Sequence, residues 1–322
     1  MGDPLLSFSD KAFKIELPQG ICSPSPPAVF DGLAYIASTN GSVVSISDSK
    51  IEKQYRGTGE MTGTPAVNDH LIVVASSAKF IFVFDRNSEK LLWKFKTKKP
   101  ITNSPIIADN SIFFGTTEGK LFALDTLGKV RWSSDVKTSV MSPSYDSGIV
   151  YIGTQNGTAA AFGASSGKLI WKSDAAGRTP CVGSDMIFYE NRNGAVVALD
   201  KKNGSERWRY DADISASAFE MAASNTTLAY AHDDMLIVLD PETGKKQWDV
   251  HFKQPLCGSP MIVSTAVYVP CSDWNLYAYD LATGMELAHT DIGFAPWGSP
   301  SYGNGKIYFP NKQTLYILLP QE

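Results

Sequence analysis

The chain has 322 residues, of which 43% are hydrophobic and 19% charged, and its formal net charge is −4. This balance excludes a disordered chain and a bundle of membrane helices. The acidic charge argues against a nucleic-acid partner, and the lack of any run of about 18 apolar residues predicts no transmembrane segment.

The first predicted element is a strand at residues 13–17, which precedes any repeat. The opening letters MGDPLLSFSD contain neither a basic segment nor a long apolar core, so they do not resemble a signal peptide. As written, the sequence therefore predicts a cytoplasmic protein. If a native leader precedes Met1, the alternative is a periplasmic or exported protein.

From Pro27 onward, a two-residue mark that usually ends in proline recurs at intervals of 37 to 41 residues. A constant period of this length indicates a repeat architecture. The second residue of the mark stands at positions 27, 65, 105, 143, 180, 221, 260 and 300.

Each copy contains the same predicted strands and turns. The second strand ends ten residues after the mark, as in IFFG and VYIG, and Asn-Gly follows it in three copies. Asn-Gly favours the positive φ angles of a tight hairpin turn. A third strand such as KLFALD, a polar turn and a fourth strand near a Trp complete the copy. Four short antiparallel strands per copy predict the blades of an all-β propeller.

The repeated tryptophans are expected to fill the seams between blades, because burying an indole ring contributes several kcal/mol. They are Trp93, Trp132, Trp171, Trp208 and Trp248. The last copy stops after its third strand, so residues 11–18 are expected to complete the last blade with residues 300–319. The sequence therefore predicts one domain over residues 1–322, an eight-bladed β-propeller whose ring of four-stranded antiparallel blades is closed by an N-terminal strand.

The segments SGIVYIGTQNG, EGKLFALDTLGKVRW and NGAVVALDKKNGSERW resemble the PQQ-like β-propeller repeat, and the resemblance covers nearly the whole chain. Members of that family include quinoprotein dehydrogenases and BamB-like outer-membrane assembly factors. Eight blades without a large insertion resemble the BamB-like type more closely. The resemblance implies a non-catalytic scaffold that binds a protein partner, either as a monomeric propeller or as a subunit of a larger assembly.

The alternative that the family implies is an enzyme or small-ligand binder, such as a dehydrogenase that uses PQQ with calcium. Those enzymes are longer and carry an adjacent-cysteine disulfide ring over the quinone, whereas this chain has no Cys-Cys pair. The histidines stand alone and the cysteines form no CxxC. We therefore expect neither a cofactor nor a metal site.

Functional residues are expected where the loops depart from the repeat. In such a ring, the loops that enter each blade lie on one face with the turns between second and third strands, and we call both the top loops. Trp274 and Trp297 are the two tryptophans outside the repeat positions, and both fall in top loops, with Phe294 near Trp297. They predict a partner-binding patch, because aromatic residues anchor interfaces. The alternative is that they pack within a loop or plug the channel.

A second departure is acidic. Glu190 stands where other copies have a small residue at the end of the second strand, and Glu220 stands in the mark of its copy. With four neighbours they predict a polar mouth for a small ligand or for acid–base chemistry. Ion pairing with the arginines is the alternative. The four neighbours are Arg178, Arg192, His232 and Asp233.

Cys257 and Cys271 flank the first hairpin of the seventh copy at its top. Antiparallel pairing could bring them within disulfide reach, and a bond would argue for an exported protein. Ordinary buried thiols are the alternative.

Overall fold

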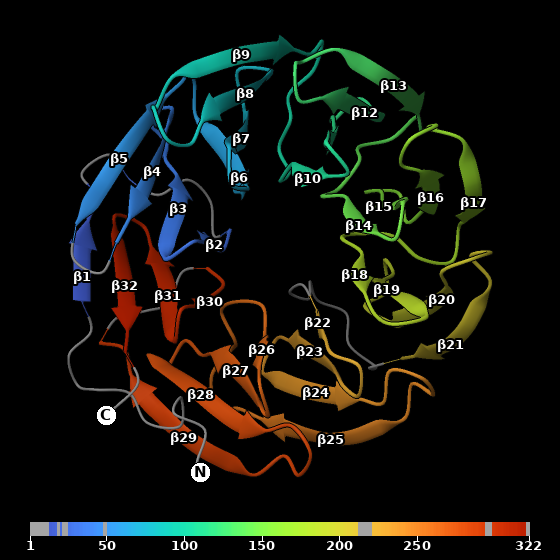
Figure 1. Ribbon diagram of the computed structural model, residues 1–322. Coiled ribbons are helices and arrows are strands. Elements are labelled where there is room, and N and C mark those ends of the chain that lie inside the picture. Colours follow the sequence, from blue (N-terminus) through green and yellow to red (C-terminus); the bar gives the residue numbers. More distant parts are fainter. Residues whose placement is uncertain are drawn as a thin grey trace. The chain divides into compact units, whose positions relative to one another are not determined.

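A computed structural model describes residues 13–17, 20, 25–47, 50–211, 221–293 and 298–319. In this part of the chain the secondary structure consists of strands, and no helix long and apolar enough to cross a membrane occurs there. The strands form eight four-stranded sheets, labelled in Figure 1. Seven of the eight follow chain order, and each pairs consecutive strands antiparallel, which defines the blades of an eight-bladed β-propeller as predicted.

The first four blades have the following bounds. Blade 1 contains β2 (Ala28–Phe30), β3 (Leu33–Ala37), β4 (Ser42–Ile46) and β5 (Ile51–Arg56). Blade 2 contains β6 (Met61–Val67), β7 (Leu71–Ser76), β8 (Phe80–Asp85) and β9 (Leu91–Lys96). Blade 3 contains β10 (Ile106–Ala108), β11 (Ser111–Gly115), β12 (Lys120–Asp125) and β13 (Val130–Asp135). Blade 4 contains β14 (Ser144–Asp146), β15 (Ile149–Gly153), β16 (Ala159–Gly163) and β17 (Leu169–Ser173).

The other four blades follow the same plan. Blade 5 contains β18 (Cys181–Val182), β19 (Met186–Glu190), β20 (Val196–Asp200) and β21 (Glu206–Tyr210). Blade 6 contains β22 (Ala222–Ala223), β23 (Leu228–His232), β24 (Met235–Leu239) and β25 (Lys246–His251). Blade 7 contains β26 (Met261–Val263), β27 (Ala266–Pro270), β28 (Asn275–Asp280) and β29 (Glu286–Asp291). Blade 8 contains β30 (Ser301–Gly303), β31 (Lys306–Asn311), β32 (Thr314–Leu318) and β1 (Phe13–Glu16).

Blade 8 joins the two ends of the chain. β1 pairs antiparallel with β32, with Phe13 opposite Ile317 and Ile15 opposite Leu315 (Figure 1). Ile15 is buried, although its strand neighbours are exposed. The predicted closure of the last blade by an N-terminal strand is therefore confirmed, with observed bounds of 13–16 inside the predicted 11–18.

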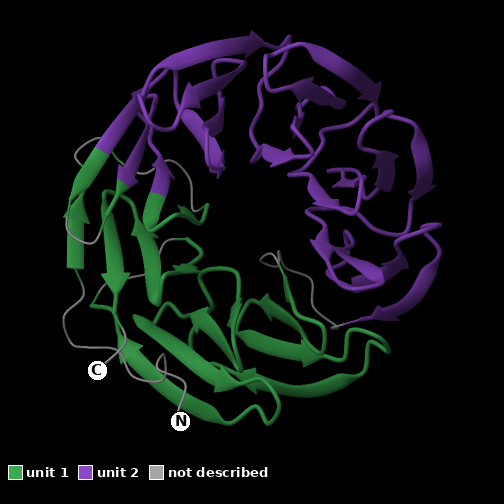
Figure 2. Cartoon of the chain, in the orientation of Figure 1, with its two compact units in different colours: residues 1–34, 46–52, 216–322 green, residues 35–45, 53–215 purple. Residues whose placement is uncertain are grey.

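The chain divides into two compact units, coloured in Figure 2. Unit 1 comprises residues 1–34, 46–52 and 216–322, and unit 2 comprises residues 35–45 and 53–215. Blades 2 to 5 belong to unit 2, and blades 6 to 8 belong to unit 1, while the boundary runs through the strands of blade 1. That residues 1–322 act as one domain stays a prediction.

The second and third strands of each blade are mostly buried, and the fourth strand is much more exposed. β11 is buried at every residue, whereas four of the six residues of β13 are exposed. β-branched and aromatic residues suit such doubly covered strands. The short polar turn after the third strand is held by its aspartate: Asp240 Oδ1 accepts a hydrogen bond from the Thr243 backbone N–H at 2.8 Å. This bond is the main cause that lowers the pKa of Asp240.

The repeated tryptophans fill the seams between blades, as predicted. The indole Nε1 of Trp132 donates to the Ala164 carbonyl of the next blade at 2.7 Å, and Trp171 does the same to Lys201 at 2.8 Å. The ring lies against the glycine of that blade's polar turn, so close that a Cβ on Gly167 would stand 2.6 Å from Trp132. Trp93, Trp132, Trp171 and Trp248 therefore each pack against and hydrogen-bond to the next blade.

The hydroxyl of the two-residue mark links successive blades near their first strands. Ser104 Oγ accepts from the Thr64 backbone N–H at 2.9 Å, and Ser142 Oγ accepts from the Ser104 N–H at 3.2 Å. The recurrence of Ser or Thr before the proline is explained by these bonds, because each hydroxyl satisfies a partly buried backbone donor of the preceding blade.

Candidate functional site

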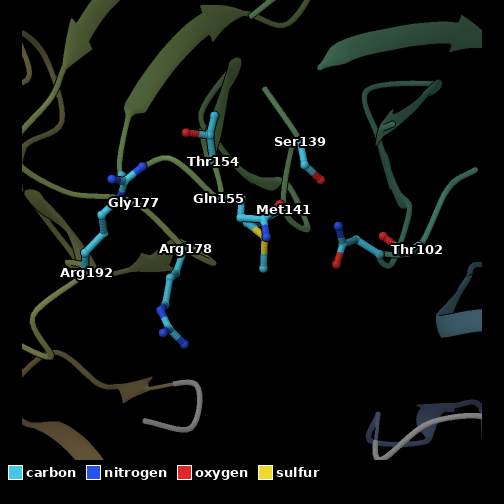
Figure 3. Close-up of a pocket in the computed structure, with 10 residues that line it drawn as sticks. Thr102, Ser139, Met141, Thr154, Gln155, Gly177, Arg178 and Arg192 are labelled. Carbon is cyan, nitrogen blue, oxygen red and sulfur yellow. The ribbon is translucent and has the colours of Figure 1, made fainter. Parts of the chain in front are cut away.

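Top loops of blades 3 to 5, all in unit 2, enclose a cavity of about 430 Å³ (Figure 3). Volumes of this size are typical of small-ligand sites. Three inter-blade loops and two hairpin turns contribute, so within this unit the two kinds of top loop do meet, as expected. The lining residues are Thr102, Asn103, Ser139, Met141, Thr154, Gln155, Gly157, Gly177, Arg178 and Arg192.

Hydrogen bonds between neighbouring loops fix the cavity wall. The Asn103 side-chain amide donates to the Val140 carbonyl at 2.9 Å, which ties the loop entering blade 3 to the loop entering blade 4. The Gln155 backbone N–H donates to the Ser139 carbonyl at 3.0 Å, and the Met141 N–H donates to the Gly153 carbonyl at 2.9 Å. The cavity is therefore preformed by backbone and amide bonds.

Glycines allow the loop entering blade 5 to pack directly on blade 4. A Cβ on Gly153 would lie 1.6 Å from the Arg178 carbonyl oxygen, and one on Gly177 would lie 2.3 Å from the Gly157 Cα. Neither distance is sterically permitted for a side chain, so both positions require glycine. This close approach carries Arg178 to the cavity, with its backbone in the left-handed region at φ 82°.

Glu190 lies beneath this loop. It ends β19, is only 4% exposed, and replaces the small residue that other blades carry there, such as Ala37 or Ala231. Its Oε2 lies 3.5 Å from Arg178 Nε, and its backbone carbonyl accepts a bond from the Gly177 N–H at 3.3 Å. Glu190 and Arg178 therefore form an ion pair. This is the alternative to an acid–base site that the sequence analysis gave.

The charged side chains that line the cavity are both arginines, and the other polar groups there are neutral hydroxyls and amides. Arg178 is 42% exposed and Arg192 is exposed, and Figure 3 shows their side chains pointing in different directions. An arrangement of donors without a lining carboxylate suits an anion better than a cation. In the described part of the chain, no group of three or more His, Cys, Asp or Glu residues gathers as a metal site would require.

The other residues predicted for the polar mouth are distributed differently. His232 and Asp233 belong to blade 6 in unit 1, where His232 is fully buried beside the Tyr230 ring and Asp233 is exposed. Glu220 lies outside the described residues. The structure therefore brings Glu190 and Arg178 together, with Arg192 on the same cavity, and the common mouth stays a prediction.

Trp274 is the described member of the predicted aromatic patch, since Phe294 and Trp297 lie outside the described residues. It occupies the turn between β27 and β28 and is 51% exposed. Its N–H donates to the Cys271 carbonyl at 3.1 Å, and its own carbonyl accepts from Ile292 at 2.8 Å. The backbone is held by these bonds and about half of the side chain is exposed, so the partner-binding patch stays a prediction.

Cys257 and Cys271 are free thiols in the structure, on neighbouring antiparallel segments joined by a bridge between Leu256 and Cys271. Burial raises the pKa of Cys257 to about 12 and that of Cys271 to about 11. Both are therefore protonated near neutral pH and poorly reactive. A disulfide between them stays a prediction.

The cavity contains residues that the sequence did not single out, among them Asn103, Ser139, Met141 and Gln155. Their positions conform to the repeat, and each is an ordinary loop residue in its own blade. Of the lining residues, the sequence singled out Arg178 and Arg192, as neighbours of the unusual Glu190. The cavity forms where loops of three different blades meet. The sequence of one repeat copy does not show which loops will be neighbours.

Comparison with known proteins agrees with this architecture. The repeat and the eight four-stranded blades define a PQQ-like β-propeller. A family profile described as outer membrane protein assembly factor BamB matches residues 14–140, 128–249 and 155–314. The chain therefore belongs to the BamB family.

Two curated relatives carry the same description. BamB of Nitrosomonas eutropha is 29% identical over 108 residues, which span 33% of this chain and 26% of that protein. BamB of Alteromonas naphthalenivorans is 27% identical over 167 residues, which span 46% of this chain and 40% of that protein. The aligned segments thus cover less than half of either relative.

Solved structures share the fold at low identity. The crystal structure of BamB from Moraxella catarrhalis has a TM-score of 0.82 at 17% identity and covers 97% of this chain and 99% of its own. The quinohemoprotein alcohol dehydrogenase of Comamonas testosteroni has a TM-score of 0.77 at 14% identity, over 97% of this chain and 77% of its own. At these identities the likeness is one of fold and does not choose between scaffold and enzyme.

Proposed function

We propose that this chain is a non-catalytic scaffold of the periplasm that binds a protein partner through its top loops and assists assembly of outer-membrane proteins. Membership of the BamB family, over residues 14–314, is the observation that carries the proposal. The preformed cavity among the top loops supports it, because a binding surface built by loops on a rigid scaffold is the usual arrangement in propellers.

The test is functional replacement. The chain is exported in a bacterium from which the resident member of this family has been deleted, and the amount of folded outer-membrane protein is measured. We expect the wild-type chain to restore it. A photo-crosslinking residue at Gln155, which is exposed at the cavity, should capture an assembly component, whereas one at Leu127 should not. Leu127 is the matched control because it is 77% exposed in the turn at the other end of blade 3.

The enzyme alternative predicts a different outcome. The purified chain would bind PQQ with calcium saturably, as followed by visible absorbance, and would oxidise alcohols in a dye-linked assay. Turnover together with failed replacement would overturn the scaffold proposal.

A further inference from the structure

We propose that the cavity of blades 3 to 5 is a carboxylate-binding site in which Arg178 is the principal contact. The inference rests on the proposed function, because it names the chemistry by which the top loops would recognise an acidic segment of a protein partner. It begins with charge. The charged side chains that line the cavity are two arginines, one of which pairs with the buried Glu190, in a chain whose net charge is −4.

The backbone of Arg178 and its contact with Glu190 position this side chain at the cavity. Its backbone is wedged against Gly153 in the left-handed region at φ 82°, where a non-glycine residue is strained. Its Nε faces Glu190 Oε2 at 3.5 Å. A buried carboxylate on one edge of the guanidinium fixes the direction of the side chain, so less conformational entropy is lost when a ligand binds.

Arg178 lines the cavity, and its guanidinium contacts Glu190 through Nε. Figure 3 shows the side chain extending away from its loop, and among the described residues the structure gives no hydrogen bond for its terminal nitrogens. A guanidinium edge with two parallel N–H groups matches the two oxygens of a carboxylate. The Ser139 hydroxyl and the Gln155 amide lie on the same cavity and can donate to a ligand's remaining polar groups.

The charge balance favours a carboxylate over a phosphate. The Glu190 carboxylate beside the Arg178 Nε repels a phosphate dianion more strongly than a carboxylate monoanion. Arg192 points away from Arg178 in Figure 3, so its contribution is the field at the cavity and not a second contact. The carboxylate can come from an acidic side chain of a peptide or from a free small acid, and the experiment separates the two sources.

The experiment is a binding cycle with the purified full chain. The probes are a labelled oligoglutamate peptide, an oligoglutamine peptide of equal length, and glutarate as the free acid. Binding is followed by fluorescence anisotropy for the peptides and by calorimetry for glutarate. We expect saturable binding of oligoglutamate, about tenfold or more weaker binding by Arg178→Gln, and no such loss for oligoglutamine, because the variant removes a contact only the carboxylate can use. Arg178→Lys should lie between, because lysine keeps the charge without the fork.

Lys137→Gln is the matched control. Lys137 lies in the neighbouring top loop with a similar left-handed φ of 68°, is 82% exposed, and does not line the cavity. Its loss should change oligoglutamate affinity by less than about twofold, because an exposed charge contributes little. Equal losses in the two variants, or equal binding of the two peptides by the wild type, would overturn the site.

The cellular assay separates this inference from the proposed function. If the wild-type chain restores outer-membrane proteins and Arg178→Gln does so equally, the scaffold stands and the carboxylate site is wrong. If glutarate binds in an Arg178-dependent manner and the peptide does not, the site stands with a free acid as its source. If the chain binds oligoglutamate through Arg178 but restores nothing, the site stands and the assembly role fails.

Discussion

Trp274 combines a backbone in the left-handed region with a half-exposed indole. Its φ is 74°, and the equivalent turn position is glycine in several blades, as at Gly119, Gly157 and Gly194, whereas blade 2 carries Lys79 there at φ 71°. A side chain in this region costs about 1–2 kcal/mol relative to glycine. An aromatic ring that is 51% exposed at a locally unfavourable backbone position is more useful for binding than for stability, which supports its assignment to a partner-binding patch.

Replacing Trp274 by glycine should therefore leave stability unchanged or raise the free energy of unfolding by up to about 1 kcal/mol, while it weakens capture of the assembly partner. Urea unfolding and crosslinking from Gln155 measure the two effects. Trp248→Ala is the contrast, because Trp248 donates to the Leu281 carbonyl at 2.9 Å in a seam, and its loss should cost about 3–5 kcal/mol. A Trp274→Gly chain that is destabilised and binds normally would refute the patch.

At the scale of elements, the polar turn of one blade and the tryptophan of the blade before it form a single unit of packing. Gly167 and Gly148 both have a positive φ, of 65° and 81°, but only Gly167 faces an indole, since a Cβ added to it would lie 2.6 Å from Trp132. Around Gly148 nothing lies within 4 Å of such a Cβ. Alanine at Gly148 therefore tests backbone strain alone, whereas alanine at Gly167 adds a clash with the seam tryptophan.

Gly148→Ala should cost about 1–2 kcal/mol from backbone strain, and Gly167→Ala should cost at least about 1 kcal/mol more because Trp132 must move. In a Trp132→Ala background the two alanine substitutions should cost the same, since the clash has gone. Chemical denaturation of the four variants and both parents gives the coupling. If Gly167→Ala remains the costlier change without Trp132, the seam does not depend on this contact.

The sequence predicted the fold far better than the site, and the physical reason is periodicity. Eight copies of one pattern locate strands, turns and seam tryptophans such as Trp132, because each copy meets the same neighbours. Glu190 could be recognised in the sequence as a departure from that pattern. Its ion pair with an arginine was one of the two interpretations that the sequence allowed. Met141 and Asn103 could not be recognised in this way. The cavity that they line is formed by loops of different blades, and their side chains have no unusual chemistry of their own.

For the whole molecule, the decisive element is β1, because it is the strand that completes the last blade. Ile15 and Leu17 are 7% and 3% exposed, and burial of two such aliphatic side chains contributes roughly 3–6 kcal/mol. That is a large share of the stability of an ordinary folded domain, about 5–15 kcal/mol. Without β1, the backbone of β32 becomes an exposed sheet edge, which invites pairing between chains.

Deleting residues 1–17 should therefore lower the unfolding midpoint and increase aggregation, whereas deleting residues 1–10 should do neither, because it leaves β1 in place. Light scattering and thermal unfolding measure the two effects, and hydrogen exchange at β32 amides reports the loss of the pairing itself. Ile15→Asp in the full-length chain gives the same result without truncation, since Ile15 faces the core opposite Leu315 and a buried carboxylate has no partner there. Unchanged hydrogen exchange at β32 after the longer deletion would contradict this prediction. It would mean that blade 8 is stable with three strands and does not need β1.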